Sequence, residues 1–442
     1  MYGAAVPNYQ GMFLRGYGSQ AHAQENGSTI GITSTTHASG SLGVAQGDAT
    51  RKADGYLHRQ GGVGNNDNFI KSCCKKQRRI HMFRSLLTFF IVICMALPLL
   101  AYAAPDENLH PQSGDFVIRD FRFSDGTSLP EVRIHYSTLG TLKRDASGKA
   151  TNAVLLLHGT TGTGNAYLTP LMRNELFAPG APLDAQQYFI VMPDGLGRGG
   201  STKPSDGLRA RFPRYGYTDV VEAHHRMLVE GLKIDHLRLV LGTSMGGMHT
   251  WIWGERYPEM ADALMPIASQ PVPMAGRNML WRQMIISAIR NDPGWQGGNY
   301  TVNPTQWTRV MPVFALMTGS PVRMQAEAPD RTAAVRLYDT LVEQAKKNDA
   351  NDVLYWFESS WDYDPSSQLA KIQAPLFAVN FADDLINATD LELMQQLVKN
   401  VPNGRYVEMQ INEHSYGHQT LARPEVWKPY LIELLKRSET QR

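Results

Sequence analysis

The stretch "LRLVLGTSMGGMHTW", Leu237 to Trp251, places one serine among small residues between two apolar runs. Its first five residues are apolar apart from Arg238, as in a buried strand, and Met245 to Tyr257 have a helical pattern. Gly242 to Gly246 match G-x-S-x-G, in which the serine lies on a sharp turn from strand to helix. The five letters alone are weak evidence, but this placement indicates that Ser244 is a nucleophile and not a hydroxyl in an ordinary glycine-rich loop.

Further along the chain, short apolar runs alternate with helical patterns such as residues 218–232. Each run ends in small or polar residues, as buried parallel strands do. The runs are "NAVLLLHG" (152–159), "QYFIVMPDG" (187–195), "ALMPIAS" (263–269) and "APLFAVNFAD" (374–383). This alternation predicts an open, mostly parallel α/β sheet with its site at the carboxyl ends of the strands. Two stretches of alternating polarity, 115–123 and 131–140, predict an antiparallel hairpin at the edge of the sheet.

Between about 270 and 366 the strand runs stop. The stretch carries aromatic and helical patterns, including "RTAAVRLYDTLVEQAKK" (331–347) and "DVLYWFESSW" (352–361). We expect a helical cap inserted over the sheet, which would shape a pocket and exclude water from it.

The composition favours a small-molecule partner. The 442 residues are 43% hydrophobic, and 43 basic against 41 acidic residues give a net charge of +2, so nothing indicates binding to nucleic acid. The three cysteines are Cys73, Cys74 and Cys94, so the chain after Cys94 has no disulfide, Cys-ligated zinc or thiol nucleophile. We expect no metal and no cofactor.

The stretch "MFRSLLTFFIVICMALPLLAYAA", Met82 to Ala104, has a basic residue, an apolar run, Pro98 and an A-x-A site. This layout predicts a secretory signal peptide over 82–103, with a transmembrane anchor as the alternative because the apolar run is long. The mature protein would then be periplasmic or secreted, without stable membrane association, and an uncleaved chain would stay membrane-anchored.

Residues 1–81 form a low-complexity extension rich in Gly, Ser, Asn and Gln, which cannot bury a core of its own. Its stretch "PNYQGMFLRGYGSQ" (7–20) weakly resembles the tip segments of phage tail-collar and tail-fibre proteins, a likeness within about residues 1–45. One interpretation is that Met82 is the start of the native protein. The catalytic domain is expected over 104–442.

A serine nucleophile needs a general base and an acid that orients the base. In strand-turn-helix sites of this kind the acid and then the base follow the serine in the chain. One apolar run ends in Asp383 and Asp384, and the next is followed by a loop with His414 and His418. We prefer Asp383, which is closer to the strand end, and His418, since Gly417 frees the backbone before it and a helix begins just after.

The oxyanion of such a reaction needs backbone N–H donors. Met245, directly after the serine, is the expected first donor, and Thr160 in the loop "HGTTGTG" (158–164) the second. The alternative for this loop is a flexible turn or a phosphate loop, but the Lys-Ser/Thr ending of a phosphate loop is absent.

From about Asp115 to the C-terminus the chain resembles the homoserine O-acetyltransferase family of α/β-hydrolases. The stretches that carry the resemblance are "SLPEVRIHYSTLGTL" (128–142), "GTSMGGMHTW" (242–251), "SAIRNDPGWQGGNY" (287–300) and "YGHQTL" (416–421). The resemblance implies the α/β-hydrolase fold with a helical cap, and it carries the family's catalytic serine, aspartate and histidine to Ser244, Asp383 and His418.

Two positions depart from the family pattern. An arginine that helps to hold the amino-acid substrate is here Ile286, with Arg282 the nearest arginine upstream, and the acidic residue after the histidine is Gln419. Burying the carboxylate and ammonium of homoserine without charged partners is costly. The expected function is therefore an exported serine acyl hydrolase, and the alternative is an acyltransferase using an acyl-CoA donor. The partner is a small acyl substrate, and a homodimer is left open.

Overall fold

The computed structural model describes residues 20–21, 36–37 and 110–440. The chain divides into two compact units, Met1–Leu100 and Ala101–Arg442. In the first unit, the described residues form two short strands that pair antiparallel, β1 and β2.

The predicted signal peptide, residues 82–103, lies outside the described residues. So does the rest of the predicted low-complexity extension apart from β1 (Gln20–Ala21) and β2 (Thr36–His37). Within the described parts of the chain, no helix has the length and apolarity needed to cross a membrane.

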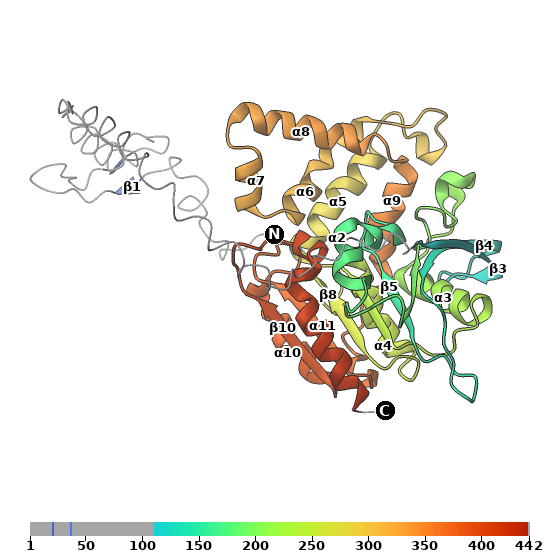
Figure 1. The fold of residues 1–442 in the computed structure, drawn as a ribbon. Helices are drawn as coiled ribbons and strands as arrows, with labels where there is room; N and C mark the ends of the chain where they lie inside the picture. The colour runs from blue at the N-terminus through green and yellow to red at the C-terminus, as the bar shows by residue number, and fades with distance from the viewer. Residues whose placement is uncertain (1–19, 22–35, 38–109, 441–442) are drawn as a thin grey trace, which may run out of the picture. The chain divides into compact units, whose positions relative to one another are not determined.

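An eight-stranded sheet runs through the second unit in the order β10-β9-β8-β7-β5-β6-β4-β3 (Figure 1). The six strands from β10 to β6 in this order are parallel, and β4 and β3 continue the sheet antiparallel. The bounds are β3 Gln112–Arg122, β4 Ser128–Leu139, β5 Ala153–Leu157, β6 Phe189–Pro193, β7 Leu239–Thr243, β8 Leu264–Ile267, β9 Leu376–Phe381 and β10 Gly404–Met409. The predicted parallel sheet and its antiparallel hairpin are confirmed.

Each central strand is buried on both faces, which is why its sequence is a continuous apolar run. In β5, Leu155 and Leu157 belong to one hydrophobic core, and Val154 and Leu156 belong to a second core on the opposite face. Helices cover both faces: α2 Pro170–Met172, α3 Tyr217–Arg226, α4 Met245–Arg256, α10 Leu393–Leu397 and α11 Pro424–Glu439.

A helical cap is inserted between β8 and β9 and lies beyond one end of the sheet (Figure 1), as predicted. Its helices are α5 Gly276–Arg290, α6 Pro312–Thr318, α7 Pro321–Glu327, α8 Arg331–Ala345 and α9 Ala350–Glu358. The cap has its own hydrophobic core, in which Trp281, Trp307 and Phe357 are buried. It therefore packs as a separate layer that can cover the carboxyl ends of the parallel strands.

Helix α9 joins the cap to the body of the domain. The indole N–H of Trp356 donates to the Gly197 carbonyl oxygen at 2.9 Å, and the Tyr355 hydroxyl donates to the Phe212 carbonyl oxygen at 2.6 Å. The loop that follows β6, which contains Gly197, is thus held directly under the cap.

Candidate active site

Ser244 lies on a strained turn between β7 and α4. Its φ of 55° and ψ of −116° are uncommon for a residue with a side chain. The backbone N–H of Ser244 donates to the Ile267 carbonyl oxygen at 2.8 Å, which ties the turn to the neighbouring strand β8. Strain that persists in a bonded turn is typical of functional sites, and the turn has the geometry that the sequence predicted.

Two glycines beside Ser244 allow the backbones to approach closely. A Cβ atom on Gly242 would lie 2.0 Å from the Gly246 carbonyl oxygen, and a Cβ atom on Gly246 would lie 1.9 Å from the Leu157 carbonyl oxygen. Real side chains do not reach such distances, so these positions accept only glycine without a shift of the backbone.

The variant Gly246→Ala is expected to lower the free energy of unfolding by about 2 to 3 kcal/mol, because a new methyl group must displace strand β5. Gly162→Ala is the matched control, since its Cβ would meet its nearest neighbour at an ordinary 3.5 Å. Its stability should change by no more than about 0.5 kcal/mol. Urea unfolding followed by circular dichroism measures both, and equal stabilities would contradict the steric argument.

Three side chains from three separate loops form one hydrogen-bonded chain. The Ser244 hydroxyl lies 2.8 Å from Nε2 of His418, and Nδ1 of His418 lies 2.7 Å from Oδ2 of Asp384. His418 and Asp384 are buried, whereas Ser244 is partly exposed. This order of hydroxyl, imidazole and carboxylate is the arrangement in which a histidine takes the proton of a serine.

Asp384 is held as a carboxylate by its surroundings. Burial opposes its ionisation, but the charge of His418 and hydrogen bonds from His418, the Asn387 side chain and the Ile386 backbone together hold the pKa of Asp384 below its ordinary value. The Asn387 amide also donates to the Ala268 carbonyl oxygen at 2.8 Å, which fixes this loop to the end of β8. Asp384 is therefore charged at neutral pH and cannot rotate away from the histidine.

The prediction of Asp383 as the orienting acid is wrong, because Asp384 holds that position. The two aspartates lie in the turn that follows β9, in which the Asp384 N–H donates to the Phe381 carbonyl oxygen at 3.0 Å, and only the Asp384 carboxylate bonds to His418. The Asp383 carboxylate instead accepts the backbone N–H of Gly417 at 2.7 Å. It thus fixes the residue before His418, a role that sequence reasoning missed.

The histidine loop is also held by the cap. A Cβ atom on Gly417, which has a φ of 63°, would lie 2.7 Å from the Gly319 carbonyl oxygen at the end of α6. Arg323 of α7 donates to the carbonyl oxygens of Glu413 and Ser415, and its guanidinium lies 4.2 Å from the centre of the Tyr416 ring. The position of His418 therefore depends on contacts with the cap, and no motif signalled Arg323.

Both predicted oxyanion donors lie beside the serine. Met245 is the first residue of α4, where backbone N–H groups have no partner within the helix. Thr160 follows Gly159, whose Cβ position would be 3.5 Å from the Ser244 Cβ atom. The loop after β5 thus runs alongside Ser244, and both residues are buried.

His158, at the start of that loop, is a neutral structural residue. Its Nε2 accepts the Gly195 backbone N–H at 2.9 Å, so its Nδ1 donates to the Gly159 carbonyl oxygen at 2.8 Å. Burial is the main cause that lowers its pKa to about 3. The imidazole joins the loop after β5 to the loop after β6 at physiological pH.

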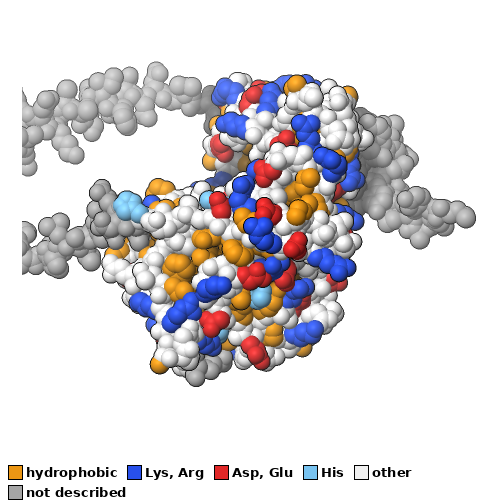
Figure 2. Space-filling model, turned by 90° about the vertical axis from the view of Figure 1, so that its right-hand side faces the viewer, with side chains coloured by type: hydrophobic (Ala, Val, Ile, Leu, Met, Phe, Trp, Pro, Cys, Tyr) orange, Lys and Arg blue, Asp and Glu red, His pale blue; other side chains and the backbone are white. Residues whose placement is uncertain are grey.

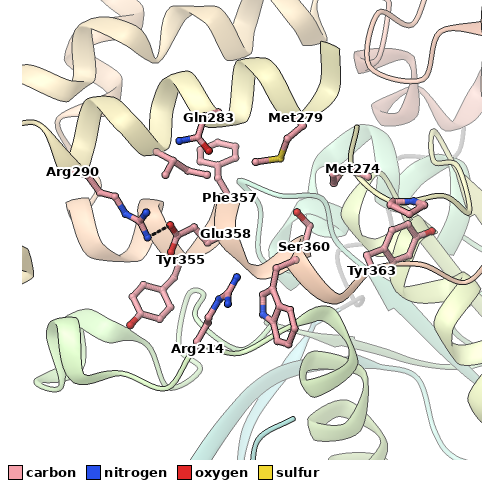
Figure 3. A pocket seen from close by; sticks show the side chains of 13 residues that line it. Arg214, Met274, Met279, Gln283, Arg290, Tyr355, Phe357, Glu358, Ser360 and Tyr363 are labelled. Atoms are coloured by element: carbon pink, nitrogen blue, oxygen red, sulfur yellow. Dashed lines mark ion pairs between the residues drawn. The ribbon is translucent and has the colours of Figure 1, made fainter. Parts of the chain in front are cut away.

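Two neighbouring cavities lie at this end of the domain. One of about 740 Å³ is drawn in Figure 3, where Arg214 and the Arg290–Glu358 ion pair lie among aromatic and methionine side chains. A second of about 440 Å³ reaches Met248 of α4 and the loop that follows Asp384. Both are lined by Pro273 and Met274, so the two cavities are neighbours, and the second lies against the segment that directly follows Asp384.

The two departures from the family pattern occupy different environments. Ile286 is buried in α5 and lines the larger cavity, whereas Gln419 is exposed. His414, the histidine that was not preferred as the base, is exposed as well. Figure 2 shows basic and acidic side chains interspersed on the face that it draws, in keeping with the balanced net charge. Among the described residues, no group of three or more His, Cys, Asp or Glu could hold a metal ion.

The comparisons with known proteins agree with this geometry. The family model described as "alpha/beta hydrolase fold" matches residues 152–417, which is more than half of the chain. The chain belongs to the α/β-hydrolase family.

Within that family it is similar to homoserine O-acetyltransferases. A homoserine O-acetyltransferase from Thermobifida fusca is 39% identical over 193 residues, which are 40% of this chain and 49% of that protein, about half its length. The same enzyme from Geotalea daltonii is 27% identical over 363 residues, covering 72% of this chain and 95% of that protein.

Two solved structures share the fold. The homoserine O-acetyltransferase from Bacillus anthracis has a TM-score of 0.64 at 20% identity and covers 74% of this chain and 97% of that chain. The acetyl esterase MekB has a TM-score of 0.63 at 23% identity, with the same shares covered.

Proposed function

We propose that the protein transfers an acyl group through an acyl-enzyme on Ser244. The hydrogen-bonded chain from Ser244 through His418 to Asp384 is the observation that carries this proposal. His418 Nε2 would accept the hydroxyl proton while Ser244 Oγ bonds to the acyl carbon, and Asp384 would stabilise the imidazolium. The proton then passes to the leaving group as the bond between it and the acyl carbon breaks.

The backbone N–H groups of Met245 and Thr160 are the proposed donors to the oxyanion. Each such donor is worth roughly a hundredfold or more in kcat, because it is oriented before charge develops on the oxygen. Met245 directly follows Ser244, and Thr160 follows Gly159, which lies against Ser244; these positions support the assignment.

In the second half of the reaction an acceptor hydroxyl would attack the acyl-enzyme, again with His418 as the base. The names of the relatives favour a transferase, with an acetyl group passing from a thioester donor to an alcohol such as homoserine. They thus favour acyl transfer over the hydrolysis expected first from the sequence.

Hydrolysis is the second candidate, and a specific observation supports it. Ile286 lines the larger cavity at the place where the family has an arginine, and Gln419 replaces the acidic residue after the histidine. Neither side chain can pair with the charged groups of homoserine, so water could replace that acceptor. The proposal also includes export of the protein by the signal peptide predicted over residues 82–103, which is supported by the sequence alone.

The test uses the full chain with acetyl-CoA, with and without homoserine. We expect an acetylated peptide containing Ser244 by mass spectrometry, and release of CoA that accelerates when homoserine is added. Release of free acetate at the same rate without homoserine would favour hydrolysis. No acylation of Ser244 by either acetyl-CoA or 4-nitrophenyl acetate would contradict both candidates.

A further inference from the structure

The loop after β5, residues 158–164, contains a tight turn that leaves the Thr160 N–H free. The Gly162 N–H donates to the Gly159 carbonyl oxygen at 3.0 Å, so Thr160 is the second residue of a β-turn. The hydrogen bond of such a turn uses the donor of the fourth residue and not that of the second. Within the described part of the chain, the Thr160 N–H donates to no other group. It is therefore available to a group held at Ser244.

Asp194 holds the far end of this loop. It directly follows strand β6 and is 5% exposed. Its Oδ1 atom accepts the Gly164 N–H at 2.7 Å. A Cβ atom on Gly164 would lie 2.3 Å from the Met192 carbonyl oxygen, so the loop backbone packs directly on the end of β6. The hydrogen bond and the close packing together fix where the loop ends.

The Asp194 side chain has no freedom to move away from Gly164. Its Oδ2 atom accepts the Gly200 N–H at 2.8 Å, and its carbonyl oxygen accepts the Ser201 hydroxyl at 2.8 Å. Its backbone N–H donates to the His135 carbonyl oxygen of β4 at 2.8 Å. Every polar group of Asp194 is thus bonded, and the carboxylate joins the loop after β5 to the loop after β6.

The same segment also holds the near end of the loop. Gly195 directly follows Asp194, and its N–H donates to Nε2 of His158 at 2.9 Å, while Nδ1 of His158 donates to the Gly159 carbonyl oxygen. Two adjacent residues after β6 therefore bind the loop on both sides of its turn. Thr160 lies between these two attachments.

The residue type at position 194 fits this task. Both side-chain oxygens of Asp194 face backbone N–H groups, and these belong to two different loops. An ionised carboxylate has two acceptor oxygens, whereas an asparagine amide would turn an N–H group toward one of the two donors. Burying a carboxylate is costly, and charge-assisted hydrogen bonds from backbone N–H groups offset that cost.

We propose that Asp194 is a positioning residue for the oxyanion site, which sets the place of the Thr160 N–H relative to Ser244. It acts through Gly164 and, by way of Gly195, through His158, and it does not touch the substrate. A donor that is displaced by about 1 Å can cost roughly a hundredfold in rate. The inference rests on the proposed function, since an oxyanion forms only if Ser244 bonds to an acyl carbon.

The first test compares Asp194→Ala with Asp219→Ala in the full chain. Asp219 is the matched control, because it is 4% exposed and its carboxylate also accepts two backbone N–H groups, those of Ser124 and Gly216. With 4-nitrophenyl acetate, Asp194→Ala should lower kcat by roughly 10- to 100-fold and change KM by less than about threefold. Asp219→Ala should retain kcat within about twofold per folded molecule. Equal losses of kcat in the two variants would overturn the positioning role.

The second test measures stabilisation of the oxyanion directly. Ser244 Oγ adds to the carbonyl carbon of a trifluoromethyl ketone, its proton passes to His418, and the carbonyl oxygen becomes a hemiketal oxyanion. The fluorine NMR signal of the bound ketone reports the pKa of this hemiketal. In Asp194→Ala that pKa should rise by about 1 to 2, which corresponds to the expected loss of kcat, and in Asp219→Ala it should not change.

The outcomes separate this inference from the proposed function. An unchanged hemiketal pKa in Asp194→Ala would overturn the positioning role. If Asp194→Ala does not fold, Asp194→Asn takes its place, and it should show a smaller rise because its amide keeps one acceptor oxygen. A hemiketal that still forms in Ser244→Ala, or none in the unaltered chain, would instead overturn the proposed function itself.

Discussion

Replacing Ser244 or His418 with alanine is expected to lower kcat for ester cleavage by roughly 10⁵- to 10⁶-fold. The hydroxyl supplies the atom that bonds to the acyl carbon, and the imidazole 2.8 Å away removes its proton, so either loss stops the same step. The double variant should be no slower than either single variant, because the two side chains act as one unit. Rates with 4-nitrophenyl acetate, measured at equal concentrations of folded protein, check both expectations.

His414→Ala is the matched control for this loss. His414 lies in the same loop as His418, but its side chain is exposed and makes no contact with Ser244. The control variant should retain kcat within about twofold, as surface substitutions usually do. Retained activity in His418→Ala, or an additive loss in the double variant, would show that another base serves Ser244.

Asp384→Asn is expected to lower kcat by roughly 10⁴-fold, with a much smaller change in KM. An amide cannot stabilise the imidazolium, and it can hold His418 in the wrong tautomer by donating to Nδ1. Because these effects concern the transfer of the Ser244 proton to His418 and not substrate binding, the loss should appear in the rate of the chemical step. Pre-steady-state release of 4-nitrophenol measures that step directly.

Asp383→Asn provides the control one residue away. The new amide keeps an oxygen that can accept the Gly417 N–H, so the His418 loop should stay in place and kcat should fall less than about tenfold. Asp383→Ala removes this acceptor and should cost more than Asp383→Asn. If Asp383→Asn were as slow as Asp384→Asn, the assignment of the acid would have to be reversed.

The elements around the nucleophile could be predicted because their signals are local. A buried strand, a G-x-S-x-G turn and a helical pattern follow one another between Leu237 and Tyr257, and the base is preceded by Gly417. The choice between Asp383 and Asp384 failed because both follow the same strand, and chain position does not reveal which carboxylate faces inward. Three hydrogen bonds from Ile386 and Asn387 hold the Asp384 carboxylate, and a fourth, from the Asn387 amide to the Ala268 carbonyl oxygen, fixes this segment to the end of β8.

The sequence was therefore sufficient to predict the parallel sheet, the cap, the serine and the histidine. Hydrophobic patterning and short-range steric effects depend on residues that are close together in the chain. The burial of Arg198 and Arg282 could not be predicted in that way. Arg198 and Arg282 are far apart in the sequence, and each looks like an ordinary surface cation until α9 brings Trp356 and Phe357 against them. The burial of these cations depends on packing among distant segments of the chain, so it is decided only in the folded domain.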